Sequence, residues 1–235
     1  MHSTNNITER TNTILKEIQN FSNVSLVLAT KTHYKFSVLQ SALGCSKNII
    51  IAENRIQEAE NKYSVLLKFS HKKHFIGYLQ SNKVRKAVQI FDCIETVDSL
   101  KLLTRINKIA GELAKNIEIF LNINISNDEK KSGILPENIE NFISEIQTKY
   151  TNKNSDDYLD HINIIGLFTI LKNNLSDSKK HEYYGNMKKL QIEVQKKIPS
   201  IIELSMGMSG DYHIALQEGA THVRIGRGIF GERSL

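Results

Sequence analysis

Short apolar runs alternate with longer amphipathic stretches along nearly the whole chain, and this alternation limits its fold more than any other feature. Between the apolar runs, hydrophobic residues recur at helical spacing, as they do in 99–115 and 137–149. Strands that alternate with helices predict a parallel sheet built from crossover units. The eight runs with the length and β-branched content of buried strands are 23–30, 47–53, 73–78, 91–97, 117–125, 161–170, 201–208 and 221–230.

Eight such units predict an α/β fold, a (β/α)₈ barrel of the TIM type. A barrel of this type takes about 250 residues, and this chain has 235, so we expect a single domain over 1–235. The only extra element that we expect is an N-terminal helix over 5–20, with Ile7, Ile14 and Ile18 on one face. The polar segments that we expect to be loops or helix starts, rather than domain linkers, are 127–131, 151–157 and 173–182.

Composition excludes several classes of protein. Hydrophobic residues make up 40% of the chain and charged residues 24%, which is the balance of an ordinary folded protein. No apolar run approaches the roughly 18 residues of a membrane-spanning helix, so we expect no membrane partner and a cytoplasmic location. The two cysteines, Cys45 and Cys93, are too few for a disulfide framework and lack the spacing of a zinc motif. We expect both to be reduced packing residues, and we predict no metal site.

The net charge of +6 raises the question of an anionic partner. The basic residues are scattered, and aromatic residues do not alternate with them, so we do not expect nucleic-acid binding. A small ligand that carries a phosphate would use the positive charge equally well.

If the barrel is right, functional residues lie where the strands end, because barrel sites are built at the carboxyl ends of the strands. In RIGRGIFG (224–231), three glycines fall within the last predicted strand, and glycine weakens a strand unless its backbone must approach something closely. A phosphate after the seventh and eighth strands is one candidate; a bulge that closes the barrel is the alternative. SMGMSGD (205–211) ends the neighbouring strand and offers the Ser209 hydroxyl to the same phosphate.

Lys31 follows the first strand directly, in SLVLATK. Most lysines at such positions are solvated, and that is the alternative here. Beside a phosphate site and other cations, however, a desolvated lysine loses proton affinity and becomes a nucleophile that forms a Schiff base with an aldehyde. Pyridoxal 5′-phosphate carries both the aldehyde and the phosphate, so the two features together point to this cofactor.

Four segments carry a family resemblance: TKT (30–32), AENRIQE (52–58), HFIGYLQSNK (74–83) and ELSMGMSGDYHIALQEGATHVRIGRGIFG (203–231). They resemble the pyridoxal phosphate homeostasis proteins, which are single-domain members of the alanine racemase-like barrels, also called fold type III. The resemblance extends over nearly the whole chain. It implies a barrel that holds pyridoxal 5′-phosphate on a lysine as an internal aldimine, without established turnover, and that serves in vitamin B6 and amino-acid homeostasis.

The resemblance also implies roles for individual residues. By their positions in the motifs, Lys31 matches the lysine that forms the Schiff base, Asn54 an asparagine that faces the cofactor, and Arg224 an arginine directed at the pyridine nitrogen. The ordinary alternatives are a surface ion pair for Arg224 and a turn or helix cap for Asn54. The residues that match the phosphate site are Ser209, Gly226 and Arg227.

Three positions depart from the family pattern. Ala52 replaces the usual glycine before the ENxxQE segment, and Phe168 replaces a methionine in the sixth strand; we expect both to change local packing. Arg227 replaces a threonine after RIG, which removes a hydroxyl but leaves a backbone N–H for the phosphate, and its guanidinium is a possible substitute. His74, which begins HFIGYLQSNK, lies nearer the start of its strand than the end, so we expect packing or support rather than catalysis.

We expect no robust catalysis. Racemisation on a lysine-bound cofactor needs a second acid or base on the opposite face of the substrate, which the two-domain racemases take from a C-terminal domain, whereas this chain ends at Leu235. A weak racemase or lyase that depends on pyridoxal 5′-phosphate is the alternative, and an unrelated phosphate-binding barrel is a more distant one. Besides the cofactor, we expect enzymes that require it as partners, and a monomer or weak dimer.

Overall fold

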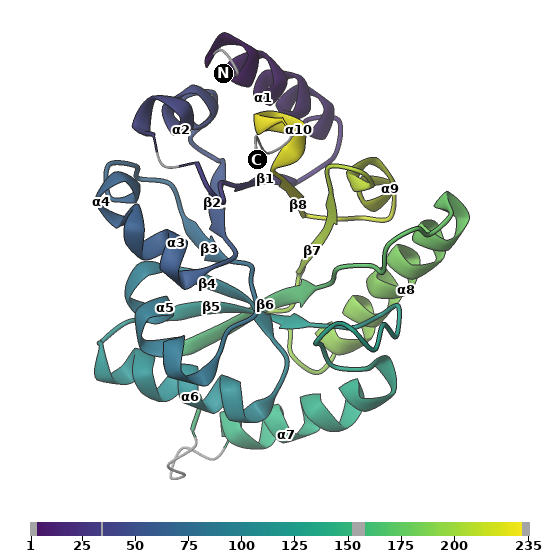
Figure 1. The fold of residues 1–235 in the computed structure, drawn as a ribbon. Helices are drawn as coiled ribbons and strands as arrows, with labels where there is room; N and C mark the ends of the chain where they lie inside the picture. Colours follow the sequence, from purple (N-terminus) through teal and green to yellow (C-terminus); the bar gives the residue numbers. More distant parts are fainter. Residues whose placement is uncertain (1–3, 34, 152–157, 232–235) are drawn as a thin grey trace.

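Eight parallel strands close into a barrel in the computed structural model, which describes residues 4–33, 35–151 and 158–231 (Figure 1). Each strand pairs with the next one along the chain, and β1 (Ser25–Ala29) closes the ring by pairing with β8 (His222–Ile225). The predicted (β/α)₈ barrel is therefore confirmed. The other strands are β2 Ile50–Glu53, β3 Lys73–Phe75, β4 Cys93–Val97, β5 Ile117–Asn122, β6 Ile162–Phe168 and β7 Glu203–Met208.

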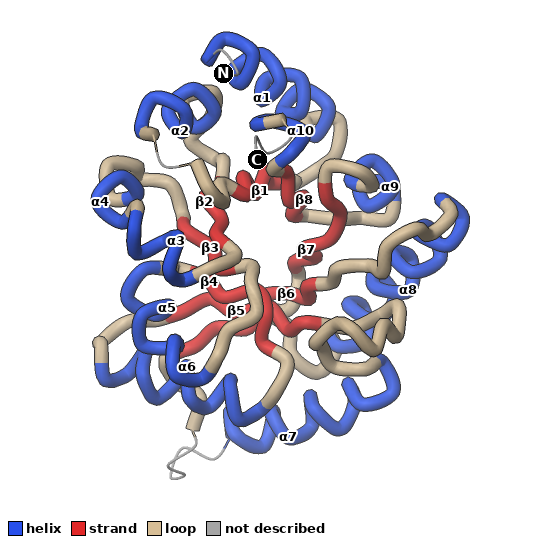
Figure 2. Tube along the Cα trace, viewed as in Figure 1, coloured by secondary structure: helices blue, strands red, loops and turns tan. Residues whose placement is uncertain are grey.

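Helices form an outer layer around the strands, as the blue segments around the red ones show in Figure 2. The first half of the chain contributes α1 Thr4–Ile18, α2 Phe36–Leu43, α3 Ile56–Asn61, α4 Tyr63–Leu66, the 3₁₀ turn η1 Ser81–Lys83, α5 Val84–Ile90 and α6 Leu100–Glu112. The second half contributes the 3₁₀ turn η2 Pro136–Asn138, α7 Ile139–Thr151, α8 Asp177–Gln195, α9 Tyr212–Gln217 and α10 Arg227–Phe230. No helix among the described residues is both long enough and apolar enough to cross a membrane.

The helix α1 is the predicted N-terminal element. Its face of Ile7, Ile14 and Ile18 is buried, as the spacing of these residues predicts. Figure 1 shows α1 beside α10, and Arg10 Nη1 donates a hydrogen bond to the Ile229 carbonyl oxygen at 3.4 Å. The two ends of the described chain thus pack together next to the β1 and β8 pair.

Alternate residues of each strand face opposite sides of the barrel wall. In β1, Leu26 and Leu28 belong to the large core between the strands and the helices, whereas Val27 packs with Ile50 and Ala52 inside the barrel. A second interior cluster among the described residues is Cys93, Phe120 and Phe168. The inside of the barrel is therefore a packed core, which leaves room for ligands at the strand ends.

The last strand is shorter than predicted, which corrects the interpretation of its glycines. β8 ends at Ile225, and the glycine-rich residues continue into the short helix α10. Gly226, with φ −129° and ψ −72°, leaves the ladder, and its carbonyl oxygen accepts from the N–H groups of Ile229 and Phe230. The glycines thus lie beyond the strand, because alternation of apolar residues does not distinguish a strand from the turn that follows it.

The predicted polar segments connect elements. Residues 127–131 form a loop, and 173–182 start as a loop that enters α8, whose first turn is capped by the Ser176 side chain. Apart from Thr151, which ends α7, the predicted segment 151–157 lies outside the described residues.

Candidate functional site

A cavity of about 840 Å³ opens at the carboxyl ends of the strands. It lies among the segments that follow β1, β2, β3, β6, β7 and β8, which is where barrel proteins place their sites. The residues that the sequence singles out for cofactor binding all line this cavity, namely Lys31, Asn54, Ser209, Arg224, Gly226 and Arg227.

Lys31 lies two residues beyond β1 and has a left-handed backbone, with φ 45°. This conformation costs a lysine free energy, and it persists only where the surrounding structure imposes it. The ammonium group of Lys62 donates to the Lys31 carbonyl oxygen and, at 3.0 Å, to the Thr30 hydroxyl. The fully buried Lys62 also forms an ion pair with Glu53 at 2.6 Å. A buried ion pair behind the strand end therefore fixes the backbone that carries Lys31.

Burial also changes the proton affinity of this ion pair. Burial raises the pKa of Glu53 to about 7, although the charge of Lys62 and the hydrogen bond from Thr30 oppose the rise. Burial likewise lowers the pKa of Lys62, against the attraction of Glu53. Both shifts have one cause, because an apolar interior disfavours a charge of either sign.

The backbone at Gly226 packs against the end of β1. A Cβ atom on Gly226 would lie 3.1 Å from the Ala29 carbonyl oxygen and 4.0 Å from Cε of Lys31, so glycine permits a close approach here. On the other side of the turn, Gly228 N–H donates to the Ser209 hydroxyl oxygen at 3.1 Å. Because a hydroxyl accepts and donates at once, Ser209 keeps its own hydrogen for a ligand.

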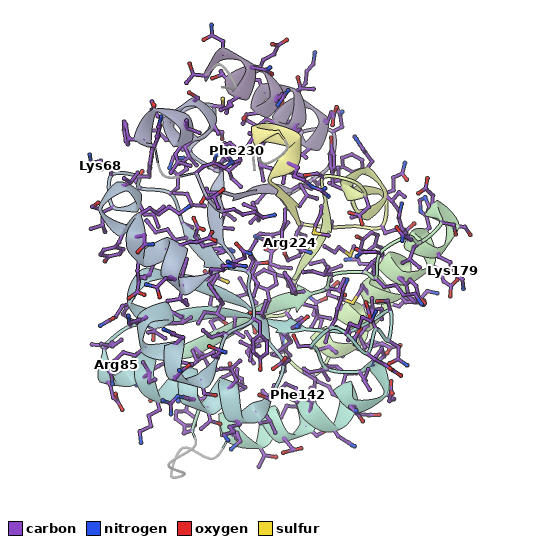
Figure 3. The ribbon with its side chains drawn as sticks, viewed as in Figure 1. Lys68, Arg85, Phe142, Lys179, Arg224 and Phe230 are labelled. Carbon is purple, nitrogen blue, oxygen red and sulfur yellow. The ribbon has the colours of Figure 1, made fainter. Side chains whose placement is uncertain are left out.

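Arg224 reaches the cavity from inside the barrel, where Figure 3 labels it within the ring of strands. Its guanidinium donates to Ser205 Oγ at 2.8 Å and to the Thr169 carbonyl oxygen at 2.6 Å. The guanidinium carbon also lies 4.2 Å from the centre of the Phe168 ring, a cation–π contact. Arg224 is only 4% exposed, which excludes the alternative of a surface ion pair.

A buried carboxylate continues this network behind Arg224. Ser205 donates to Glu95 Oε2 at 2.5 Å, and His74 Nδ1 lies 2.6 Å from Glu95 Oε1. Burial alone would raise the pKa of Glu95, but the hydrogen bond from His74 and the nearby positive charges bring it below its ordinary value. The ionised Glu95 therefore balances Arg224, and His74 supports this network from within the barrel.

Asn54 follows β2 directly and lines the cavity. Its Oδ1 atom is buried and has no hydrogen-bond partner among the residues that the structure describes. The adjacent backbone is closely packed, because a Cβ atom on Gly77 would lie 1.9 Å from the Asn54 carbonyl oxygen. An unpaired buried acceptor costs about 1 to 3 kcal/mol, so a ligand that donates to Oδ1 would recover free energy.

The residues that lie behind the cavity are not among those predicted from the sequence. Glu53 and Glu95 could have been predicted as buried and paired, because each places a carboxylate in an apolar strand, where a charge needs a partner. Lys62 and Ser205 could not have been predicted from the sequence, because their partners lie on segments that only the folded barrel brings close. Phe168, expected only to change packing, forms one face of the Arg224 environment.

Sequence comparison identifies relatives over almost the whole chain. The family model described as alanine racemase, N-terminal domain, matches residues 3–234. A Synechocystis protein named pyridoxal phosphate homeostasis protein is 38% identical over 212 residues, which cover 89% of this chain and 92% of the relative.

Structural comparison finds the same barrel in solved proteins. PipY of Synechococcus elongatus with bound pyridoxal 5′-phosphate is 31% identical, with a TM-score of 0.84, and the match covers 96% of this chain and all of PipY. The PipY structure without the cofactor matches with a TM-score of 0.85. An alanine racemase of Clostridium difficile is 16% identical, with a TM-score of 0.74 over 97% of this chain and 58% of the racemase, and it shows the fold alone.

Proposed function

The chain belongs to the alanine racemase N-terminal domain family and, within it, to the pyridoxal phosphate homeostasis proteins, and from this premise we propose that it binds pyridoxal 5′-phosphate in the cavity around Lys31. Its role is to hold the cofactor for vitamin B6 and amino-acid homeostasis. The observation that carries the proposal is the convergence of the motif residues on one cavity at the strand ends.

The cavity provides suitable donors for a phosphate. The Ser209 hydroxyl, whose oxygen already accepts from Gly228 N–H, directs its remaining hydrogen to a phosphate oxygen. Gly226 brings the backbone close, and Arg227 lines the same cavity. Hydrogen bonds from charged donors to phosphate are among the stronger ones in proteins, so this end of the cavity gives most of the affinity.

Lys31 provides the covalent attachment in this proposal. When bound, the cofactor supplies an aldehyde that condenses with a lysine amine to a Schiff base. The amine must be neutral to react, and Lys31 lines the same cavity as the residues proposed to hold the phosphate. Lys62 holds the Lys31 carbonyl oxygen and so keeps the side chain at the cavity edge.

Arg224 favours binding over turnover. A guanidinium has donors and no acceptor and stays protonated, so a pyridine nitrogen that faces it must accept a hydrogen bond and remain unprotonated. An unprotonated ring withdraws electrons poorly, which disfavours carbanion chemistry. The alternative, a weak racemase or lyase, is supported only by the fold that this chain shares with alanine racemase.

The proposal extends to partners and location. Enzymes that require the cofactor receive it from this chain, which acts as a monomer or a weak dimer. The cytoplasm is the location that we propose, because Cys45 and Cys93 are both free and reducing compartments keep thiols in that state.

The absorbance spectrum of purified protein with added cofactor, combined with amino-acid turnover, tests the function. Wild type and Lys31→Ala are compared with Lys35→Ala, which changes an exposed lysine four positions along the chain. We expect the Schiff-base band in wild type and Lys35→Ala only, and turnover no faster than that of free cofactor in all three. Turnover that depends on Lys31 would support an enzyme instead, and a wild type without the band would contradict a covalent attachment of the cofactor at Lys31.

A further inference from the structure

Three neighbouring strands bring together side chains that can each bind a metal ion. They lie at the amino end of the barrel, opposite the cofactor cavity. His74 of β3 pairs in register with Cys93 of β4, and Cys93 pairs with Glu118 of β5. Because residues in register on parallel strands face the same side of a sheet, the three side chains lie next to one another. One ring nitrogen of His74, Cys93 Sγ and one carboxylate oxygen of Glu118 all lie within 4.8 Å of each other.

His74 has one ring nitrogen to spare. Its side chain is 1% exposed, and Nδ1 is bonded to Glu95 Oε1. Since Glu95 also accepts from Ser205 Oγ and an ionised carboxylate only accepts, Nδ1 is the donor. Nε2 is buried and has no hydrogen-bond partner within the described part of the chain. A histidine held by a carboxylate through one nitrogen, with the other left open, is the arrangement that metal-binding histidines adopt.

A second cavity reaches two members of this cluster, His74 and Glu118, whereas Cys93 lies behind them and is fully buried. This cavity has a volume of about 620 Å³ and is lined by residues that precede or begin the strands, including Lys72, His74, Glu118, Glu203 and His222. A metal ion could enter through it, and a water molecule from it could complete a coordination shell.

We propose that His74 Nε2, Cys93 Sγ and a Glu118 carboxylate oxygen bind a zinc ion at the amino end of the barrel, with a water from the cavity as fourth ligand. Imidazole, thiolate and carboxylate together suit zinc, and three protein ligands plus water form a tetrahedral site. Ligand bonds of about 2.0 to 2.3 Å require ligand atoms roughly 3.3 to 3.8 Å apart. The partly exposed Glu118 side chain closes the remaining gap by rotation.

The charges around the cluster both favour and oppose the ion. Glu95 and Glu203 add negative charge on the barrel side. Lys72 opposes binding, since its ammonium holds both Glu118 oxygens at 2.8 and 2.9 Å, but its side chain is 58% exposed and can move into solvent. The Cys93 thiol gives up its proton to solvent as the sulfur–zinc bond forms, so each ion bound releases one proton.

The sequence contains no zinc motif, because such motifs place their ligands close together along the chain. Here one ligand comes from each of three successive strands, and the spacings of 19 residues between His74 and Cys93 and of 25 between Cys93 and Glu118 match no short motif. Only the register of the barrel brings them together.

Titration of the full chain with cobalt(II), a spectroscopic substitute for zinc, tests the proposal. We expect one cobalt ion per chain, with the visible bands of a tetrahedral site and a thiolate-to-cobalt band, all abolished by adding zinc. Cys45→Ala is the matched control, because it changes the other cysteine, which lies outside the cluster. It should bind as wild type does. Cys93→Ala should lose the thiolate band and bind more weakly, by at least the roughly ten- to hundredfold that loss of an outer-shell partner costs.

Glu118→Gln is the second variant, since a partly exposed side chain is replaced by one of similar shape, and circular dichroism checks that each variant is folded. It should keep the thiolate band but weaken cobalt binding by roughly tenfold or more. The proposal is overturned if wild type shows no thiolate-to-cobalt band, if the band survives in Cys93→Ala, or if Glu118→Gln binds as tightly as wild type.

Discussion

At the residue scale, the candidate site depends on backbone geometry as much as on side chains. Lys31 carries the proposed covalent bond, yet its φ of 45° is unfavourable for a lysine on its own. Gly226 contributes no side chain, but the absence of a Cβ atom lets its backbone approach Ala29 and Lys31 closely. Strained or closely packed backbone is common at functional sites, because the surrounding structure imposes it there.

Replacing Ser209 should weaken the binding of pyridoxal 5′-phosphate but not that of pyridoxal, which lacks the phosphate. If the Ser209 hydroxyl donates to the phosphate, Ser209→Ala removes one hydrogen bond to a charged group, worth about 1.5 to 3 kcal/mol. Affinity for pyridoxal 5′-phosphate should then fall by roughly ten- to a hundredfold, while the weaker affinity for pyridoxal should not change. Equilibrium binding of both vitamers to both proteins measures this, and an equal loss for the two vitamers would place the phosphate elsewhere.

His222 should make the protein sensitive to acid. Burial lowers its pKa from 6.5 to about 4, so between these values the unfolded chain binds a proton that the folded chain does not. The free energy of unfolding should therefore be highest above about pH 6.5, where His222 is neutral in both states. It should fall by roughly 3 kcal/mol as the pH drops toward 4.

Urea unfolding from pH 7 to pH 4 measures this loss. His222→Phe should flatten the pH dependence, whereas His213→Asn, which changes a largely exposed histidine, should not. A His222→Phe protein with the slope of wild type would show that other groups cause the acid sensitivity.

At the element scale, Lys62 ties two helices to two strand ends. It lies between α3 and α4, and it contacts the end of β2 and the segment after β1. Lys62→Met leaves Glu53 buried without its partner, which should destabilise the fold by about 3 kcal/mol and weaken cofactor binding through the freed Lys31 backbone. The double variant with Glu53→Gln should regain part of the stability but not the binding. Chemical denaturation and cofactor titration of the two variants measure both effects, and a single variant as stable as wild type would contradict the anchoring role.

The junction of β1 and β8 leaves little room for a side chain at Gly226. A Cβ atom there meets the Ala29 carbonyl oxygen at 3.1 Å, so Gly226→Ala requires a small shift of the neighbouring backbone. We expect this shift to weaken cofactor binding by roughly tenfold, as loss of one good hydrogen bond would. Gly210→Ala is the matched control, because Gly210 lines the same cavity and a Cβ on it meets nothing within 4 Å. Cofactor titrations of the two variants compare them, and equal affinities would show that the junction is permissive.

Element types could be predicted from the sequence, but several element ends could not. Alternation of apolar residues predicts β8, and the spacing of Ile7, Ile14 and Ile18 predicts α1. The same alternation runs past Ile225 into α10, because the apolar residues that continue the pattern pack as a helix behind a glycine turn. The hydrophobic pattern predicts which residues are buried. It does not predict whether their backbone forms a strand or a helix.

At the scale of the whole molecule, the barrel explains why the site residues could be predicted while their supports could not. Any residue placed after a parallel strand reaches the carboxyl end of a barrel, so Lys31, Asn54 and Ser209 meet there once the strands are known. The buried chain from Arg224 through Ser205 to Glu95 crosses the inside of the barrel. Contacts of that kind depend on the strand register, which the sequence does not state.

Borohydride reduction of the cofactor-loaded protein, followed by peptide mapping, tests the central claim most directly. Reduction fixes a Schiff base as a stable amine, so it records which lysine carries the cofactor. We expect one cofactor per chain, attached to Lys31, and no fixed cofactor in Lys31→Ala. Attachment to Lys35, Lys83 or Lys62, or an equal yield from Lys31→Ala, would contradict the account of Lys31 as the residue that holds the cofactor.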